Sequence, residues 1–478
     1  MRPLFAALLP AALIALPYDA YPNTNAAYAL DLGPKSPGPS TSTAFYKALG
    51  GAASLAACAA AAASWVNASA PGARCLTAVW LRAPSNATFE GTCWCMPQPK
   101  WIPVADGGAD SARLRVPCAS DFDCSYNGAC GAGGACVCDV GWRGLRCGEL
   151  ALGAVDAAAP GLREANASTG ANVSTWGAPM LLDGATGTWH AWASEMVNGC
   201  GLNTWRSNSQ VVHFEAGDPS GPWARREVTQ PVFAHEPDVV RGPAGEWVMV
   251  WSAWPLPDAA DRCANCSAGA TAPGGPRGGC GPHYMHGFKQ MMAVAPGPNG
   301  PWDAFEVPQL SAGWDWNFAL AIRADGSAEG LIRAGMAWRA PPGGWRNASA
   351  WAPVGGAPEG PQLPDNSNVE DPALWIDAKG RLHALFHSME PSTRDVAYCG
   401  VHAFSEAGGA WTSGGWAFGA TVNFTDGTSF TFSRRERPHL LFNGDGTPRA
   451  LSSGAQYGGP PTSQGDGIFT LVQPVLRA

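Results

Sequence analysis

Acidic residues recur close to proline in the C-terminal two thirds of the sequence, in front of short apolar runs. Glu236 and Asp371 each directly precede a proline, and Glu436 stands two residues before one. Carboxylates gathered in one pocket can share the roles of general acid and general base, because crowding of like charges raises the pKa of one while a nearby cation keeps another ionised. These residues predict acid and base chemistry, provided that the fold brings them together.

The segments that carry these residues form a repeat. Each opens with a polar or proline-containing cluster, runs through three or four apolar residues, turns at a glycine-containing loop and returns through a second strand; the five segments begin at Trp176, His235, Trp316, Glu370 and Glu436. A second strand–turn–strand phrase lies between several of them, beginning at His213, Ala293 and Val401. Four strands in each of five units predict a mainly β fold, with a five-bladed β-propeller over 170–478; a β-sandwich with decorated loops is the alternative.

Propeller geometry predicts which residues share a pocket. If first strands line the central channel, the start of each first strand and the end of its antiparallel second strand lie at one face. Catalytic candidates there are Glu436, Asp371, Glu236 and Asp315, and substrate-binding candidates are Glu195, Trp251, Arg333, His387, Arg435 and Asn317. Carboxylates interleaved with Arg, His and Trp suit cleavage of a glycosidic bond, which needs a protonated acid and an ionised partner. The pocket composition therefore indicates a carbohydrate ligand.

The phrase from Asp371 through Pro372 and Asp377 to Gly380 is similar to an inner-strand motif of one enzyme group. Residues 170–478 resemble the five-bladed propeller glycoside hydrolase superfamily of arabinanases, xylosidases, invertases and levansucrases. The resemblance implies that Asp371 tunes the pKa of the acid and orients substrate, and that Glu436 is the general acid.

The resemblance also implies that the base or nucleophile comes from the blade before Asp371. That position reads Asp315-Trp316-Asn317, so Asp315 serves only if the strand register is displaced and Asn317 does not serve. Glu236 is the other candidate for an essential carboxylate. The first repeat has no acid at Trp176-Gly-Ala-Pro. Two hypotheses follow: a secreted glycoside hydrolase, or a non-catalytic extracellular glycan-binding or adhesion protein on a degenerate hydrolase propeller.

His383 and His387 lie four residues apart on one strand and therefore on the same face. A hydrogen-bonding role is favoured over a metal in the channel, because no third ligand is evident from the sequence. We predict no metal and no cofactor.

Six cysteines between 118 and 147 follow the spacing C-x5-C-x5-C-x5-C-x-C-x8-C. Residues 113–150 resemble an EGF-like module, which implies the pairs Cys118–Cys130, Cys124–Cys136 and Cys138–Cys147 and allows contact with an extracellular protein partner. A zinc cluster is the alternative, disfavoured because no histidine interleaves these cysteines. Residues 21–112 form a further cysteine-stabilised module, with a strand expected after Cys75; it is similar to apple or PAN modules, and an unrelated cap is the alternative.

The N-terminal segment and the composition indicate the compartment. Residues 1–20 hold one early cation and a short apolar run typical of a secretory signal peptide, with a short buried helix as the alternative. Fifteen cysteines and seven N-x-S/T sequons agree with a secreted glycoprotein. No later stretch is long enough to cross a membrane, and a net charge of -8 without a Lys/Arg cluster argues against nucleic-acid binding.

Overall fold

The structure is a computed structural model of the 478-residue chain. It describes residues 117–162, 164–165, 172–253, 288–311, 317–354, 369–388, 400–406, 411–458 and 467–477, together with the backbone of seven strands between residues 18 and 114. Within this part of the chain, no helix is both long and apolar enough to cross a membrane. The chain divides into two compact units, the first comprising 1–138 and 144–147 and the second comprising 139–143 and 148–478.

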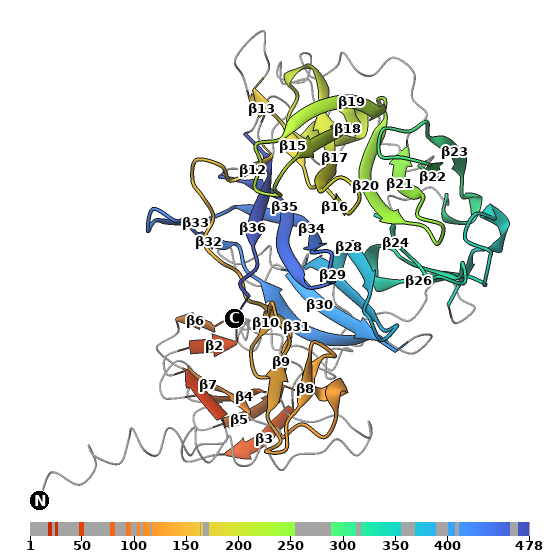
Figure 1. The fold of residues 1–478 in the computed structure, drawn as a ribbon. Helices are drawn as coiled ribbons and strands as arrows, with labels where there is room; N and C mark the ends of the chain where they lie inside the picture. The colour runs from red at the N-terminus through yellow and green to blue at the C-terminus, as the bar shows by residue number, and fades with distance from the viewer. Residues whose placement is uncertain are drawn as a thin grey trace, which may run out of the picture. The chain divides into compact units, whose positions relative to one another are not determined.

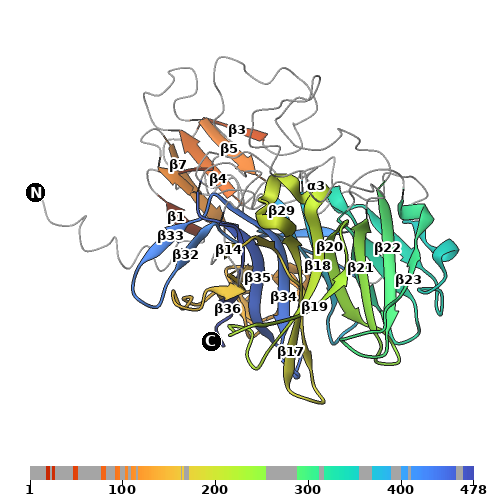
Figure 2. The same cartoon turned by 90° about the horizontal axis from the view of Figure 1, so that it is seen from above.

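The second unit contains five antiparallel sheets that are the blades of a propeller, so the predicted fold class is confirmed (Figure 1). The first blade consists of β15 (Thr175–Trp176), β16 (Met180–Asp183), β17 (Thr188–Met196), β18 (Ser209–Ala216) and β19 (Ala224–Gln230). The second consists of β20 (Ala234–Arg241), β21 (Trp247–Ala253), β22 (Lys289–Ala295) and β23 (Asp303–Glu306). Figure 2 shows these four strands side by side in that order.

The remaining three blades repeat the same up-and-down order. The third consists of β24 (Ala319–Ile322), β25 (Ala328–Leu331), β26 (Ala337–Ala340) and β27 (Ala352–Pro353). The fourth consists of β28 (Val369–Ile376), β29 (Leu382–Ser388), β30 (Gly400–Ser405) and β31 (Thr412–Phe418). The fifth consists of β34 (Arg434–Phe442), β35 (Pro448–Gln456), β36 (Phe469–Pro474) and β12 (Gly161–Leu162).

The first strands close a ring around the axis. Each contacts the next in the order β16, β20, β24, β28 and β34, and β34 in turn contacts β16 (Figure 1). The fifth blade takes its outermost strand, β12, from a segment before the first blade. This pairing ties the two ends of the propeller together and gives β36 a partner, which removes an exposed sheet edge.

The hydrophobic core lies between adjacent blades. Trp192 of the first blade packs with Trp247 and Trp251 of the second, while Phe318 and Trp351 of the third pack against second-blade strands. Similar buried clusters join the third blade to the fourth and the fifth to the first. Because each blade buries both faces against neighbours, strands such as β21 and β29 are buried along almost their whole length rather than at every second residue.

The first unit contains a five-stranded sheet and a disulfide-linked segment. The sheet follows the order β1 (Tyr18–Tyr21), β7 (Ala109–Leu114), β4 (Thr77–Leu81), β5 (Thr92–Met96) and β3 (Lys47–Gly51), and β2 (Thr24–Ala26) pairs with β6 (Pro103–Ala105). Strand β4 confirms the strand expected after Cys75. Residues 1–17, which hold most of the predicted signal peptide, lie outside the described residues.

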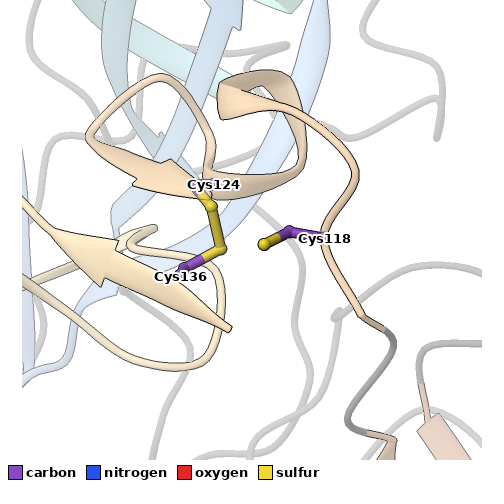
Figure 3. A group of neighbouring side chains, drawn as sticks. All are labelled: Cys118, Cys124 and Cys136. Carbon is purple, nitrogen blue, oxygen red and sulfur yellow. A yellow bond between two sulfur atoms is a disulfide. The ribbon is translucent and has the colours of Figure 1, made fainter. Parts of the chain in front are cut away.

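Three disulfides hold the segment from Cys118 to Cys147. They are Cys118–Cys130, Cys124–Cys136 and Cys138–Cys147, the pairing that the EGF-like resemblance implied. Figure 3 shows the Cys124–Cys136 disulfide with Cys118 beside it. The sulfurs are consumed in covalent bonds, so this group is not the zinc cluster that the cysteine spacing left open.

Candidate functional site at the ring of first strands

A left-handed residue marks the start of every first strand. Gly177, Glu236, Asn317, Asp371 and Arg437 all have φ between 49° and 64°. At the second, fourth and fifth blades the register of pairing shifts across this position, as in a β-bulge. A bulge or a left-handed residue turns a side chain away from the ordinary alternation, and the five left-handed residues around one axis direct these positions at a common centre.

Arg437 is the centre of this ring. Its Nη1 atom lies 2.9 Å from Glu236 Oε1 and 3.4 Å from Asp371 Oδ1, and its backbone N–H donates to Asp371 Oδ2 at 3.2 Å. Asn317 Nδ2 donates to Asp371 Oδ1 at 2.6 Å. All four side chains are at least nine-tenths buried. Two of the predicted catalytic carboxylates are therefore brought together, but each is paired with the same guanidinium.

Arg437 also explains the missing acid of the first blade. A Cβ atom at Gly177 would lie 2.7 Å from Arg437 Cβ, closer than real side chains approach one another. The fifth blade therefore fills the space that a first-blade carboxylate would need. Glycine is required at this position both for its left-handed backbone and for the close approach of Arg437.

A second group of carboxylates surrounds His387, which is fully buried. His387 Nδ1 lies 3.3 Å from Glu370 Oε1 and 3.8 Å from Asp371 Oδ2, and Nε2 lies 3.9 Å from Glu436 Oε1. Burial by itself lowers the pKa of His387, but the negative charges of Glu436, Glu370 and Asp371 outweigh it and hold the pKa above its usual value. The carboxylates thus bias the imidazole toward its cationic form.

Glu436 and Glu370 differ in their electrostatic surroundings. Burial raises the pKa of Glu436, although His387 and Arg434 oppose the shift. Burial also acts on Glu370, but its contact with His387 and the positive charge of Arg333 dominate and lower its pKa. Arg333 Nη2 lies 2.9 Å from Glu370 Oε2, and Arg434 Nη1 lies 3.2 Å from Glu436 Oε1. One carboxyl group is therefore biased toward the protonated form and the other toward the anion.

The flanking arginines indicate where the cluster meets solvent. The side chains of Arg333 and Arg434 are 37% and 27% exposed, whereas His387 and Asp371 are buried. Both arginines lie at strand ends on the face where the first strands begin. A ligand that reaches the cluster from this face meets these two cations first.

Three predicted substrate-binding residues lie elsewhere. Arg435 is fully buried and donates to Ser453 Oγ, Gly419 O and Gln473 Oε1. These contacts point it into the fifth blade, because consecutive residues of a strand face opposite sides and Glu436 takes the side of the cluster. Placing Arg435 in the pocket was wrong.

Glu195 and Trp251 are the other two. Glu195 accepts hydrogen bonds from Gln210 Nε2 and from the guanidinium of Arg225, on the third and fourth strands of its own blade, so it points away from the axis. Trp251 packs in the core between the first and second blades, where it contacts neighbours such as Met249. The position of these residues at a strand end correctly predicted the face of the propeller on which they lie. It did not predict whether their side chains point toward the axis or away from it. Asp315 lies outside the described residues.

Donor atoms of Glu370, Asp371, His387 and Glu436 all lie within 4.8 Å of one another, a spacing that a metal ion could use. In this arrangement the cationic imidazole and the nearby arginines supply the positive charge that the carboxylates need. His383 does not join the group, since its Nδ1 lies 3.1 Å from His402 Nε2 and its Nε2 lies 3.5 Å from Asp377 Oδ2. His383 and His387 therefore do not form the shared metal site that the sequence left as the lesser alternative.

A cavity of about 460 Å³ follows the axis beyond the cluster. Its walls are the first strands beyond their left-handed residues, with apolar side chains such as Leu320 and Leu374. Asp238 and His439 line it, and their closest atoms lie 3.6 Å apart. The cavity extends toward the hairpin turns at the opposite face, so the charged cluster lies beside it rather than inside it.

Arg437 and Glu370 are the residues that the sequence reading undervalued. Aligning the repeats on their prolines places Arg437, not Glu436, at the position of Glu236 and Asp371, since each directly precedes a proline. The same alignment places Glu370 at the position of Glu436, one residue earlier. The sequence therefore contains the information that Arg437 is equivalent to Glu236 and Asp371, but it emerges only when the repeats are aligned on their prolines and not on their acidic residues.

The sequence matches no protein-family model and no curated protein. Among solved structures, the fold is similar to a mutant GH43 protein from Bacillus licheniformis, at a TM-score of 0.41 and 13% identity over 66% of this chain and 55% of that one. This chain thus spans about half the length of that protein. A GH43_1 enzyme from Xanthomonas citri complexed with xylotriose has a TM-score of 0.41 at 10% identity, over 67% of this chain and 92% of that one.

An endo-arabinase from Bacteroides thetaiotaomicron has a TM-score of 0.37 at 12% identity, over 68% of this chain and 97% of that one. All three TM-scores lie below 0.5, so the likeness assigns neither a reaction nor a catalytic residue to this chain. The chemistry of the cluster has to be argued from its own side chains.

Proposed function

We propose that the protein is a secreted glycoside hydrolase whose general acid is Glu436 and whose ionised partner is Glu370. The opposite pKa shifts of these two carboxyl groups, on either side of His387, carry this proposal. Glycosidic cleavage needs one proton donor at the leaving oxygen and one anion that activates water or attacks the anomeric carbon. Glu436 supplies the proton and Glu370 supplies the negative charge.

The remaining members of the cluster position these two groups. His387 contacts both carboxylates and fixes their spacing, and Arg333 keeps Glu370 ionised. Asp371 and Glu236 hold Arg437 in the centre, which makes them positioning residues in this proposal. This differs from the role that the family resemblance implied for Asp371, because its oxygens accept from Asn317 and Arg437 rather than facing outward.

The second candidate is a glycan-binding protein without turnover. Two observations favour it: Arg437 pairs with both Glu236 and Asp371, and Asn317 stands in the third blade where an acid is expected. In that case the exposed Arg333 and Arg434 contact hydroxyl groups of the sugar, and the carboxylates hold the arginines in place. Contact of the EGF-like segment with an extracellular protein remains a prediction under both candidates.

The test is a screen of the secreted protein against aryl glycosides and labelled polysaccharides, run beside Glu436→Gln and Glu370→Gln. Loss of a general acid or base costs about 10²- to 10⁴-fold in rate, so both variants should lose turnover while they retain ligand binding. Glu195→Gln is the matched control, because this glutamate is equally buried in the same propeller and bonded to Arg225 outside the cluster. Its turnover should stay at the wild-type level.

The pH profile separates the two roles. Turnover requires protonated Glu436, so the rate should fall on the alkaline side above a pKa that is higher than that of an ordinary glutamate. If the wild type, Glu436→Gln and Glu370→Gln all bind sugar saturably and none of them turns it over, the glycan-binding candidate replaces the hydrolase. Turnover that survives in Glu436→Gln would remove this residue as the acid.

A further inference from the structure

Two imidazoles and a carboxylate meet in the first blade, on its second and third strands and away from the central cluster. His190 Nδ1 lies 2.9 Å from His213 Nε2 and 3.6 Å from Glu215 Oε1. One donor atom of each residue lies within 4.8 Å of the other two. His190 and His213 are 3% and 0% exposed, and the Glu215 side chain is 19% exposed, so the group opens to solvent on the glutamate side.

We propose that His190, His213 and Glu215 bind a zinc ion or a similar divalent transition metal. Zinc prefers imidazole nitrogen and carboxylate oxygen, and bond lengths near 2.0–2.1 Å in a tetrahedron place ligand atoms about 3.3 Å apart. The separations of His190 Nδ1 from His213 Nε2 and from Glu215 Oε1, 2.9 and 3.6 Å, lie on either side of that value. Three protein ligands leave the fourth position to water.

The surroundings orient these ligands in the way that metal sites require. Glu227 Oε1 lies 3.0 Å from His213 Nδ1 and accepts its proton, so Nε2 accepts the hydrogen bond from His190 Nδ1, whose proton a metal ion would replace. Arg226 Nε donates to Glu215 Oε2 at 2.7 Å and leaves Oε1 for the metal. A carboxylate behind a ligating histidine fixes its tautomer and raises its basicity.

Metal binding requires imidazoles that carry no charge, and the surroundings of this pair disfavour the charged form. Burial and the neighbouring His213 lower the pKa of His190 to about 4, against the opposing charges of Glu215 and Asp183. Burial also lowers the pKa of His213, although Glu227 and Glu215 oppose it. The positive charges that face the group are those of Arg226 and Arg241, and they weaken cation binding without occupying the donor atoms.

The fourth blade provides an internal comparison. His383 and His402 occupy the equivalent places on β29 and β30, with Nδ1 and Nε2 3.1 Å apart. Phe404 lies across from His383 where Glu215 lies across from His190, and Gly414 lies against His402. The imidazole pair alone is therefore a packing feature of both blades. Among their described residues, only the first blade places a carboxylate within 4.8 Å of both imidazoles. In the fourth blade the nearby carboxylate, Asp377, lies behind His383, 3.5 Å from Nε2.

The experiment uses the full chain, first stripped of metal and then dialysed against zinc, with bound zinc measured by elemental analysis. Cobalt is the spectroscopic probe, because four-coordinate Co²⁺ absorbs strongly in the visible. We expect one bound zinc that His213→Gln and Glu215→Gln abolish, and whose affinity Glu227→Gln weakens by about 10- to 100-fold. The matched control His383→Gln changes the fourth-blade pair and should bind zinc like the wild type.

Glu436→Gln tests the competing site, since donor atoms of the central cluster also lie within 4.8 Å of one another. It should leave zinc binding unchanged. If His213→Gln does not fold, Glu215→Gln still decides the matter, because its side chain lies near the surface. The proposal would be overturned if Glu215→Gln still binds zinc or if Glu436→Gln does not. It would also be overturned if the wild type binds no zinc.

Discussion

Replacing Arg437 with methionine removes the cation shared by two buried carboxylates. Glu236 and Asp371 are 7% and 5% exposed and lie 2.9 and 3.4 Å from the same Nη1 atom. Removing one partner of a buried ion pair costs about 3–5 kcal/mol, because an uncompensated charge remains. The backbone N–H of residue 437 still donates to Asp371 in the variant, so the cost falls mainly on Glu236.

The stability lost in Arg437→Met should depend on pH, because protonation of Glu236 removes its buried charge. When Arg437 is removed, the buried Glu236 can take up a proton. At pH 7 this costs about 1.36 kcal/mol for each unit between pH 7 and the ordinary glutamate pKa near 4.3, or about 3.7 kcal/mol. At pH 5 the same protonation costs only about 1 kcal/mol. The variant raises the folded-state pKa, so its loss of stability grows as pH rises and should shrink by about 2.7 kcal/mol from pH 7 to pH 5.

The assay is urea unfolding of wild type and Arg437→Met at both pH values, with linear extrapolation to water. Arg449→Met is the control: it makes the same chemical change in a pair with Asp218 in which both side chains are 45% exposed, and it should cost less than about 1 kcal/mol at either pH. A loss at pH 7 no larger than the control, or a loss equal at pH 5 and 7, would refute the view that Arg437 compensates buried charge.

Two further predictions concern packing and the cationic histidine. Gly400→Ala should destabilise by about 1–3 kcal/mol in urea unfolding, because its Cβ would lie 1.8 Å from Phe418 Cε1, while Gly444→Ala has open space and should be neutral. His387 has a raised pKa, so its stabilisation is complete below about pH 6.5 and is lost as pH rises through its folded value; wild-type stability should fall over that window and His387→Gln should show a flatter profile. Equal slopes for the two proteins would contradict the assigned charge.

Much of the fold could be predicted because its signals are local. The hairpin phrases that begin at His235 and Glu370 became β20 with β21 and β28 with β29, since apolar runs around a glycine turn specify a hairpin without reference to the rest of the chain. The cysteine spacing likewise matched the three disulfides of the first unit. The outermost strand of the fifth blade could not be found this way, because Gly161–Leu162 pairs with residues about 300 positions later.

The candidate site was predicted in part. Glu436, Asp371, Glu236, His387, Asn317 and Arg333 all take part in the connected charged cluster, as the common face of strand starts and strand ends implied. Arg435 and Glu195 could not be assigned correctly, since the face of a strand end does not say toward which side of the strand a side chain points. The pairing of His190 with His213 had no sequence signal, because these residues meet only when β17 and β18 align.

The sequence by itself determined the repeat of the hairpins, the mainly β fold class and the set of residues that start each blade. It could do so because apolar runs, glycine turns and prolines act over a few residues. The tertiary structure decided which of those residues face the axis. A bulge that places residue 437 in the left-handed region reverses the alternation that a straight strand would follow. Arg437 therefore fills the centre, Gly177 must leave it space, and Glu436 and Glu370 are left as the carboxylates beside His387.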